Sequence, residues 1–143
     1  MSLQKNILNE REDILTNLNE DEEKAMMEIL KIGTSAGGAR PKAVIGYNPK
    51  TKEIRSGQGN VPKGFEHWLL KLDGVSGEQF GESFGWGRVE YAYYLMAIDS
   101  GIEISECQLL EENGRAHFMT KRFDRQDNTK HHVQSLCGLQ HYD

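Results

Sequence analysis

The sequence predicts an α+β domain in which an antiparallel sheet of about five strands carries one helix on a face. Apolar residues recur at helical spacing over residues 4–32 and 87–100. Short β-branched and aromatic runs between turn residues occupy 43–72, which is typical of strands. An Asn-Gly dipeptide at 113–114 separates two further strand-like runs and indicates a β-hairpin.

The first 32 residues are predicted to form a helical segment. Its apolar residues fall into two sets of near-helical spacing, which an acidic stretch at 19–23 separates. We therefore expect two helices or one long bent helix over 4–32, ended by Gly33. The apolar residues are Ile7, Ile14, Leu15, Leu18, Ala25, Met26, Ile29 and Leu30.

Three strands are expected in the next part of the chain. The strongest candidate is the aromatic and aliphatic run that ends at Asp73-Gly74. Alternation within this run places Lys71 on the same face as Leu69. The three expected strands are residues 43–47, 53–55 and 66–72.

A helix is expected after an irregular, glycine-rich stretch at 75–87. It extends over 87–100, where Val89, Tyr93 and Met96 form an apolar stripe of the kind that packs on a core.

The last part of the chain is expected to contain a hairpin, a loop and a short helix. The hairpin strands are 108–112 and 116–123, joined by the Asn-Gly turn. A polar loop at 124–130 precedes a C-terminal helix at 132–139.

Length and charge limit the possible functions. A chain of 143 residues suits one domain, and its 17 basic and 22 acidic residues give a net charge of −5, which disfavours a nucleic-acid binder. The longest apolar run, 92–98, is too short to span a bilayer, and no apolar signal segment follows Met1. We therefore expect a cytoplasmic protein with no membrane partner.

The two cysteines, Cys107 and Cys137, are expected to be free, buried thiols. The chain has no Cys-x-x-Cys pair, and the histidines near the cysteines lack zinc-ligand spacing, so no metal site is expected. These histidines are His117, His131, His132 and His141.

Two features suggest anion binding. The glycines of the 34–42 loop let backbone N–H groups approach an anion, and Arg40 and Lys42 add positive charge. The alternative is an ordinary glycine-rich turn. Lys71 could bind phosphate as a point charge, or could be a solvent-exposed edge-strand lysine that prevents sheet-to-sheet pairing.

Glu90 lies in the first turn of the expected helix. A carboxylate there is favoured by the helix dipole alone. Alternatively, Glu90 forms an ion pair with Lys71 and orients it for nucleotide phosphates.

The strand end at 121–125 could hydrogen-bond a flat heterocycle through its backbone, with Phe123 packing on the ring. The alternative is a charged strand terminus in which Asp124 pairs with Arg122 or Arg125, an exposed pair worth roughly 0–1 kcal/mol.

The order of these motifs resembles the HipA family of bacterial serine/threonine-protein kinases, the toxins of HipA/HipB toxin–antitoxin modules. The resemblance covers residues 33–143. Its most specific parts are Ser-Ala-Gly-Gly-Ala-Arg-Pro-Lys at 35–42 and Arg-Phe-Asp-Arg at 122–125.

The resemblance implies a role for each motif. Ser35 falls on the serine that family members autophosphorylate, Lys71 on the lysine that contacts ATP phosphates, and Glu90 on its helix partner. Residues 121–123 fall on the hinge that receives adenine, and Gln134 looks like the glutamine of the next helix. The implied nucleotide-binding residues are Ser35, Gly37, Gly38, Ala39, Arg40, Lys42, Lys71, Glu90, Lys121, Arg122 and Phe123.

The resemblance also implies a protein-kinase-like N-terminal lobe over 33–143, with the helical segment 1–32 before it. ATP and Mg²⁺ would serve the complete protein, and a HipB-like helix-turn-helix antitoxin would be a partner. No residue indicates the protein substrate.

Phosphoryl transfer needs carboxylates for the substrate hydroxyl and for Mg²⁺, and the resemblance implies that both lie beyond the hinge. No such motif follows Phe123. We therefore expect an ATP-binding half that has no phosphotransferase activity by itself. Two alternatives stay open: a non-catalytic protein-interaction domain with a kinase-lobe fold, and an unrelated α+β domain.

Overall fold

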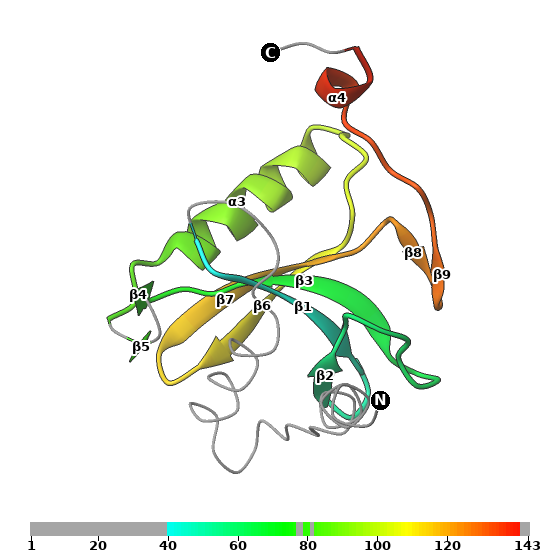
Figure 1. The fold of residues 1–143 in the computed structure, drawn as a ribbon. Helices are drawn as coiled ribbons and strands as arrows, with labels where there is room; N and C mark the ends of the chain where they lie inside the picture. The colour runs from blue at the N-terminus through cyan, green and yellow to red at the C-terminus, as the bar shows by residue number, and fades with distance from the viewer. Residues whose placement is uncertain (1–39, 77–78, 81, 141–143) are drawn as a thin grey trace.

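A five-stranded antiparallel sheet organises the molecule (Figure 1). The computed structural model describes residues 40–76, 79–80 and 82–140. The predicted helical segment 1–32 and loop residues 33–39 lie outside these ranges. The elements in chain order are β1 (Lys42–Tyr47), β2 (Ile54–Ser56), β3 (Glu66–Lys71), β4 (Val75–Ser76), β5 (Gln79–Phe80), α3 (Trp86–Asp99), β6 (Cys107–Glu112), β7 (Arg115–Lys121), β8 (Arg125–Gln126), β9 (Thr129–Lys130) and α4 (Leu136–Gln140).

The strand order is β2-β1-β3-β7-β6, and every neighbouring pair is antiparallel. The α+β class, the antiparallel sheet and the packed helix are therefore confirmed. Helix α3 lies across the sheet and contacts β7 and β6 (Figure 1).

The β6–β7 hairpin forms at the predicted turn. Asn113 and Gly114 have φ values of 42° and 78°, so both central residues are left-handed, as a two-residue type I′ turn requires. Glu112 pairs with Arg115 on either side of it. The Asn-Gly dipeptide thus sets the register of both strands.

Two segments that we predicted to be irregular contain short hairpins. Residues 75–87 include the β4–β5 pair, and residues 124–130 form the β8–β9 pair. In the second hairpin Asp127 adopts a φ of 52°, a conformation that Asp tolerates better than most residues. The turn chemistry at Asp127 was thus the signal that our sequence analysis missed.

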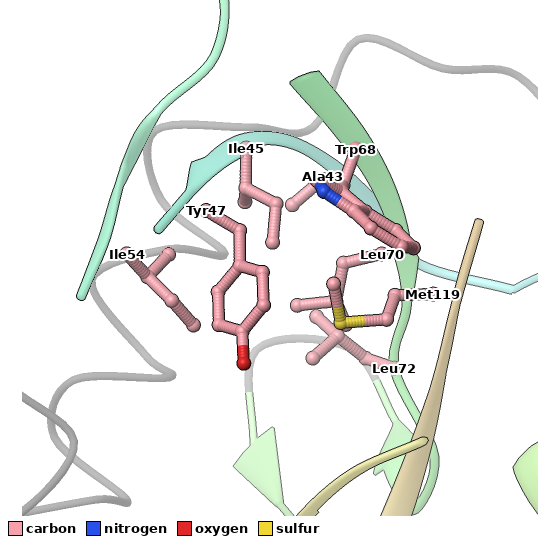
Figure 2. Packing of buried hydrophobic residues seen from close by; sticks show 8 residues of the cluster. All are labelled: Ala43, Ile45, Tyr47, Ile54, Trp68, Leu70, Leu72 and Met119. Carbon is pink, nitrogen blue, oxygen red and sulfur yellow. The ribbon is translucent and has the colours of Figure 1, made fainter. Parts of the chain in front are cut away.

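One face of the sheet holds the hydrophobic core (Figure 2). The register pairs Ile45 with Trp68 and Leu70 with Met119, so side chains from three strands meet on this face. Trp68 also meets the ring of Tyr47 edge-on at 6.1 Å. The core residues are Ala43, Ile45, Tyr47, Ile54, Trp68, Leu70, Leu72 and Met119.

The opposite face, which we call the helix-side face, is the one that α3 covers in part. Cross-strand pairing places Lys42 beside Lys71 and Lys71 beside Phe118 on this face. Val44, Leu69 and Thr120 form the next row along the strands. The prediction that Lys71 and Leu69 lie on one face of the strand, opposite the core residue Leu70, is therefore confirmed.

Helix α3 faces the sheet with the side that contains Gly87, not with the predicted apolar stripe. Val89, Tyr93 and Met96 are 45, 66 and 62 % exposed, so the prediction that they form the packed face was wrong. A Cβ on the buried Gly87 would lie 1.8 Å from the carbonyl oxygen of Ala116. Gly87 marks the side of the helix that faces the strands, and the half-buried residues of α3 continue that side: Glu90, Tyr91, Tyr94 and Ala97.

The C-terminal region also differs from the prediction. Helix α4 begins only at Leu136, and residues 132–135 before it have no regular structure. Both cysteines are free thiols as expected, but only Cys107 is buried. Cys137 is exposed, because all described residues of α4 are exposed.

We predict that Gly87→Ala lowers the free energy of unfolding by about 1–3 kcal/mol, because the added methyl group collides with the backbone of Ala116. Urea denaturation measures the change. Gly138→Ala in α4 is the matched control, since the nearest atoms there are flexible side-chain ends at 3.3 Å or more. Equal stability of Gly87→Ala and the wild type would contradict the close packing of α3.

Candidate functional site

Lys71 and Glu90 form an ion pair between the sheet and the helix. The Lys71 Nζ lies 2.5 Å from Glu90 Oε2, and the two side chains are 26 and 20 % exposed. The same Nζ lies 5.5 Å from the ring centre of Phe118. Of the two interpretations of Glu90, the structure shows the ion pair that the resemblance implied, and this pair fixes the lysine on the helix-side face.

Two further cations gather at this carboxylate. The guanidinium of Arg40 contacts the second oxygen, Oε1, of Glu90. Lys42 lies directly opposite Lys71 in the β1–β3 register, and its Nζ donates to the carbonyl oxygen of Arg40 at 3.3 Å. Two cations thus contact one carboxylate, and Lys42 lies across the strands from one of them, a concentration of positive groups of the kind that binds phosphate oxygens.

A pocket of about 710 Å³ opens on the same face of the sheet. Its floor is Val44, Leu69 and Thr120, and Leu69 precedes Lys71 by two residues on the same strand. This volume lies within the usual range of small-molecule sites. The remaining lining residues are Gln58, Ile104, Ser105, Lys121, Arg122, Phe123, Asp124, Arg125 and Lys130.

The segment 121–124 forms one wall of this pocket. The N–H of Lys121 donates to the carbonyl of Glu106 at 2.8 Å, and the N–H of Arg122 donates to the carbonyl of His67 at 2.9 Å. The N–H of Phe123 has no acceptor within the part of the chain that the structure describes. Of these three amides, Phe123 therefore offers the donor that a ligand could use.

Side-chain contacts hold this wall in place. Lys121 Nζ lies 2.5 Å from a carboxylate oxygen of Glu66. Arg122 donates two hydrogen bonds to Asp124, at 2.8 and 2.5 Å, and these bonds lower the pKa of Asp124. Between the two partners that the sequence left open for Asp124, the structure selects Arg122.

Comparison with known proteins identifies the family. The family model of the HipA-like C-terminal domain matches residues 34–143. The chain belongs to the HipA family. The resemblance that the order of motifs indicated is therefore confirmed, whereas no curated protein and no solved structure matches the chain.

Some residues to which the resemblance assigns a role are not part of the pocket or of the ion pairs described above. Gln134 is exposed before α4 and does not line the pocket described above. The predicted loop residues Ser35, Gly37, Gly38 and Ala39 are not among the described residues. Within 40–140, the described positions contain no three His, Cys, Asp or Glu side chains placed to hold a metal ion. No described helix is long and apolar enough to cross a membrane.

A buried polar network beside the turn of the β6–β7 hairpin was not predicted. Arg115 donates two hydrogen bonds to Glu112, at 2.5 and 3.2 Å. The N–H of Asp73 donates to Nδ1 of His117 at 2.9 Å, so the neutral ring carries its proton on Nε2, which lies 3.1 Å from Glu112 Oε1. His117 is thus a fully buried structural residue, and its proximity to Cys107 in the sequence was uninformative.

The ionisation of this network follows from its burial and its hydrogen bonds. Burial lowers the pKa of His117 below its usual 6.5, against the opposing effect of Glu112. Burial alone would raise the pKa of Glu112, but the hydrogen bonds from Arg115 and His117 outweigh it and lower that pKa. The cluster therefore folds with a neutral histidine beside a charged carboxylate and a charged guanidinium.

Asp73 connects this network to the start of α3. Its Oδ2 accepts from the Ser83 hydroxyl at 2.5 Å and from the Gly85 N–H at 3.2 Å. Burial raises the pKa of Asp73, but these bonds outweigh it, and the net pKa is lowered. Gly85 is the N-cap of α3 and makes no side-chain cap, so the bond from its N–H to the Asp73 carboxylate is the contact that ties the start of the helix to the sheet side. The helix that holds Glu90 is thereby anchored.

We predict that the free energy of unfolding falls as the pH decreases from 7.5 to 5.5. The unfolded His117 takes up a proton near pH 6.5, whereas the folded ring, with its lowered pKa, resists protonation. The contribution has a slope of at most about 1.4 kcal/mol per pH unit. Urea denaturation at several pH values measures it.

His117→Asn keeps an acceptor for the Asp73 N–H and removes the titrating ring. The free energy of unfolding of this variant should be lower at pH 7.5, but it should change less between pH 7.5 and 5.5 than that of the wild type. His132→Asn, at an exposed position, should keep the wild-type slope. An unchanged slope in His117→Asn would refute this assignment.

Proposed function

We propose that this chain is the ATP-binding part of a HipA-like serine/threonine-protein kinase, with the fold of a kinase N-terminal lobe. One observation supports the proposal most. A pocket large enough for a heterocycle and a strand lysine paired with a helix glutamate lie on the same face of one sheet. Protein kinases use such a lysine–glutamate pair at nucleotide phosphates.

The phosphate end of the proposed site is the cation cluster. Lys71 acts as a point charge for the phosphates, and Glu90 holds its side chain against the sheet. Arg40 and Lys42 bring two more cations from the segment that continues the glycine-rich loop. A triphosphate would share Arg40 and Lys71 with Glu90, the carboxylate that both of them contact.

The base end of the proposed site is the pocket beside the hinge. Val44 and Leu69 offer an apolar floor against which adenine would lie. The Phe123 N–H is the donor available for a ring nitrogen, since the two preceding amides bond within the protein. This division makes Phe123 the residue that reads the base through its main chain.

Transfer of the phosphoryl group to a protein serine or threonine is proposed for the complete kinase. That step needs a carboxylate for the substrate hydroxyl and ligands for Mg²⁺, and the described residues supply no cluster of three metal-ligating side chains. The proposal for these residues is therefore nucleotide binding. A HipB-like antitoxin as partner, autophosphorylation of Ser35 and a cytoplasmic location extend the same proposal.

A second candidate, a non-catalytic docking module, is favoured by the outer face of α3. Val89, Tyr93 and Met96 are exposed there, and exposed apolar groups of this kind mark interaction surfaces. In that case the cation cluster would contribute nothing to function.

We predict that Lys71→Ala weakens ATP binding by at least about tenfold, because charge-assisted hydrogen bonds contribute about 1.5–3 kcal/mol. Isothermal titration calorimetry measures the dissociation constant, and a thermal melt verifies folding. Lys50→Ala, in the exposed β1–β2 turn, should bind as the wild type does. Wild-type protein that binds no ATP would refute the proposal and favour the docking module.

A further inference from the structure

The two side walls of the pocket come from separate parts of the chain. Arg125 and Lys130, which pair with each other in the β8–β9 hairpin, line one side. Gln58, from the loop between β2 and β3, lines another. The shape of the pocket therefore depends on what holds this hairpin against this loop.

Asn128, at the turn of the hairpin, makes that connection through its carboxamide. Its Oδ1 accepts from the Val61 N–H at 2.8 Å, and its Nδ2 donates to the Val61 carbonyl at 3.0 Å. The same Oδ1 lies 3.2 Å from His67 Nε2, which must be the donor in that contact. Although Asn128 itself is exposed, Val61 and His67 are 6 and 4 % exposed, so the bonds enter a buried region.

Both partners of Asn128 are tied to the pocket. The carbonyl of His67 accepts the N–H of Arg122, next to Phe123 in the hinge. Val61 packs on β1 at Gly46, where a Cβ would lie 2.6 Å from Val61 Cγ1. The carboxamide of Asn128 thus connects the β8–β9 hairpin to strand β3 at His67 and to the β2–β3 loop at Val61.

The hairpin has little else within itself to fix its position. It consists of two strands of two residues each, and an isolated two-stranded hairpin is at best marginally stable in water. The hydrogen bonds of Asn128 to a buried backbone therefore supply much of its positional restraint. Since the hairpin follows the hinge directly, its position also constrains the chain at Phe123, whose amide, unlike those of Lys121 and Arg122, has no acceptor among the described residues.

We propose that Asn128 is a positioning residue for the base end of the nucleotide pocket. It holds the β8–β9 hairpin against Val61 and thereby fixes the wall that includes Phe123. The inference rests on the proposed function, because it assigns the base to this pocket. It predicts that Asn128 affects the nucleoside and the nucleotide equally, whereas Lys71 affects only the phosphates.

The test is a titration of adenosine and of ATP, by calorimetry, into the wild-type chain and its variants. Asn128→Ala should weaken both ligands by the same factor, about five- to tenfold, corresponding to the loss of one or two neutral hydrogen bonds. Lys71→Ala should weaken ATP alone. Asn60→Ala, an exposed asparagine beside Val61, is the matched control and should change neither affinity.

Folding and local structure are checked on the same proteins. A thermal melt shows whether Asn128→Ala is folded at the titration temperature, and Asn128→Asp, which keeps both accepting contacts, replaces it if it is not. In ¹H–¹⁵N spectra the Phe123 amide should shift in the Asn128 variant and stay in place in Asn60→Ala. A merely stabilising contact would lower the melting temperature without moving either the affinity or this signal.

The outcomes separate this inference from the proposed function. Wild-type protein that binds neither adenosine nor ATP overturns the proposed function itself. Wild-type protein that binds both, with Asn128→Ala binding both equally well, overturns only the role of Asn128. If Asn128→Ala binds ATP more weakly but adenosine as well as the wild type does, the role of Asn128 is also overturned, because the effect would then lie at the phosphate end.

Discussion

The contact between α3 and the sheet at Glu90 is the interaction on which the site depends. A lysine on a strand has no fixed position by itself, and the Glu90 carboxylate holds it only if the helix stays at one distance and rotation. Two other features serve that requirement. Gly87 permits the close approach, and Asp73 anchors the first turn. The ion pair of Lys71 and Glu90 therefore depends on two residues that take no part in it, Gly87 and the buried Asp73.

The two faces of the sheet carry different kinds of contact. Successive side chains on a strand alternate, so β3 directs Trp68 and Leu70 into the core and Leu69 and Lys71 to the helix-side face. A substitution of Lys71 can therefore disturb the ion pair with Glu90 with little change in the packing of the core face. The arrangement also explains why charged residues occur in the middle of the sheet at low cost, since they lie on the solvent-accessible side.

Local signals in the sequence were sufficient for part of this structure. Alternation placed Lys71, the Asn113-Gly114 dipeptide set the hairpin, and the family resemblance paired Lys71 with Glu90. The packed side of α3 was wrongly predicted, because the helix has apolar residues on more than one side and the close approach is made by Gly87, which has no side chain to mark it. The bonds of His117 and Asn128 join residues 44 and 61 or more positions apart, and no local pattern encodes such pairings.

The two ion pairs of Glu90 make the position of Lys71 sensitive to ionic strength. The carboxylate attracts Arg40 and Lys71 at once, whereas Lys42 and Lys71 are like charges directly opposite each other on an antiparallel strand pair. Added salt screens the attraction and the repulsion alike, but the attractions act at contact distance. The hold of the helix on this lysine should therefore loosen as the ionic strength rises.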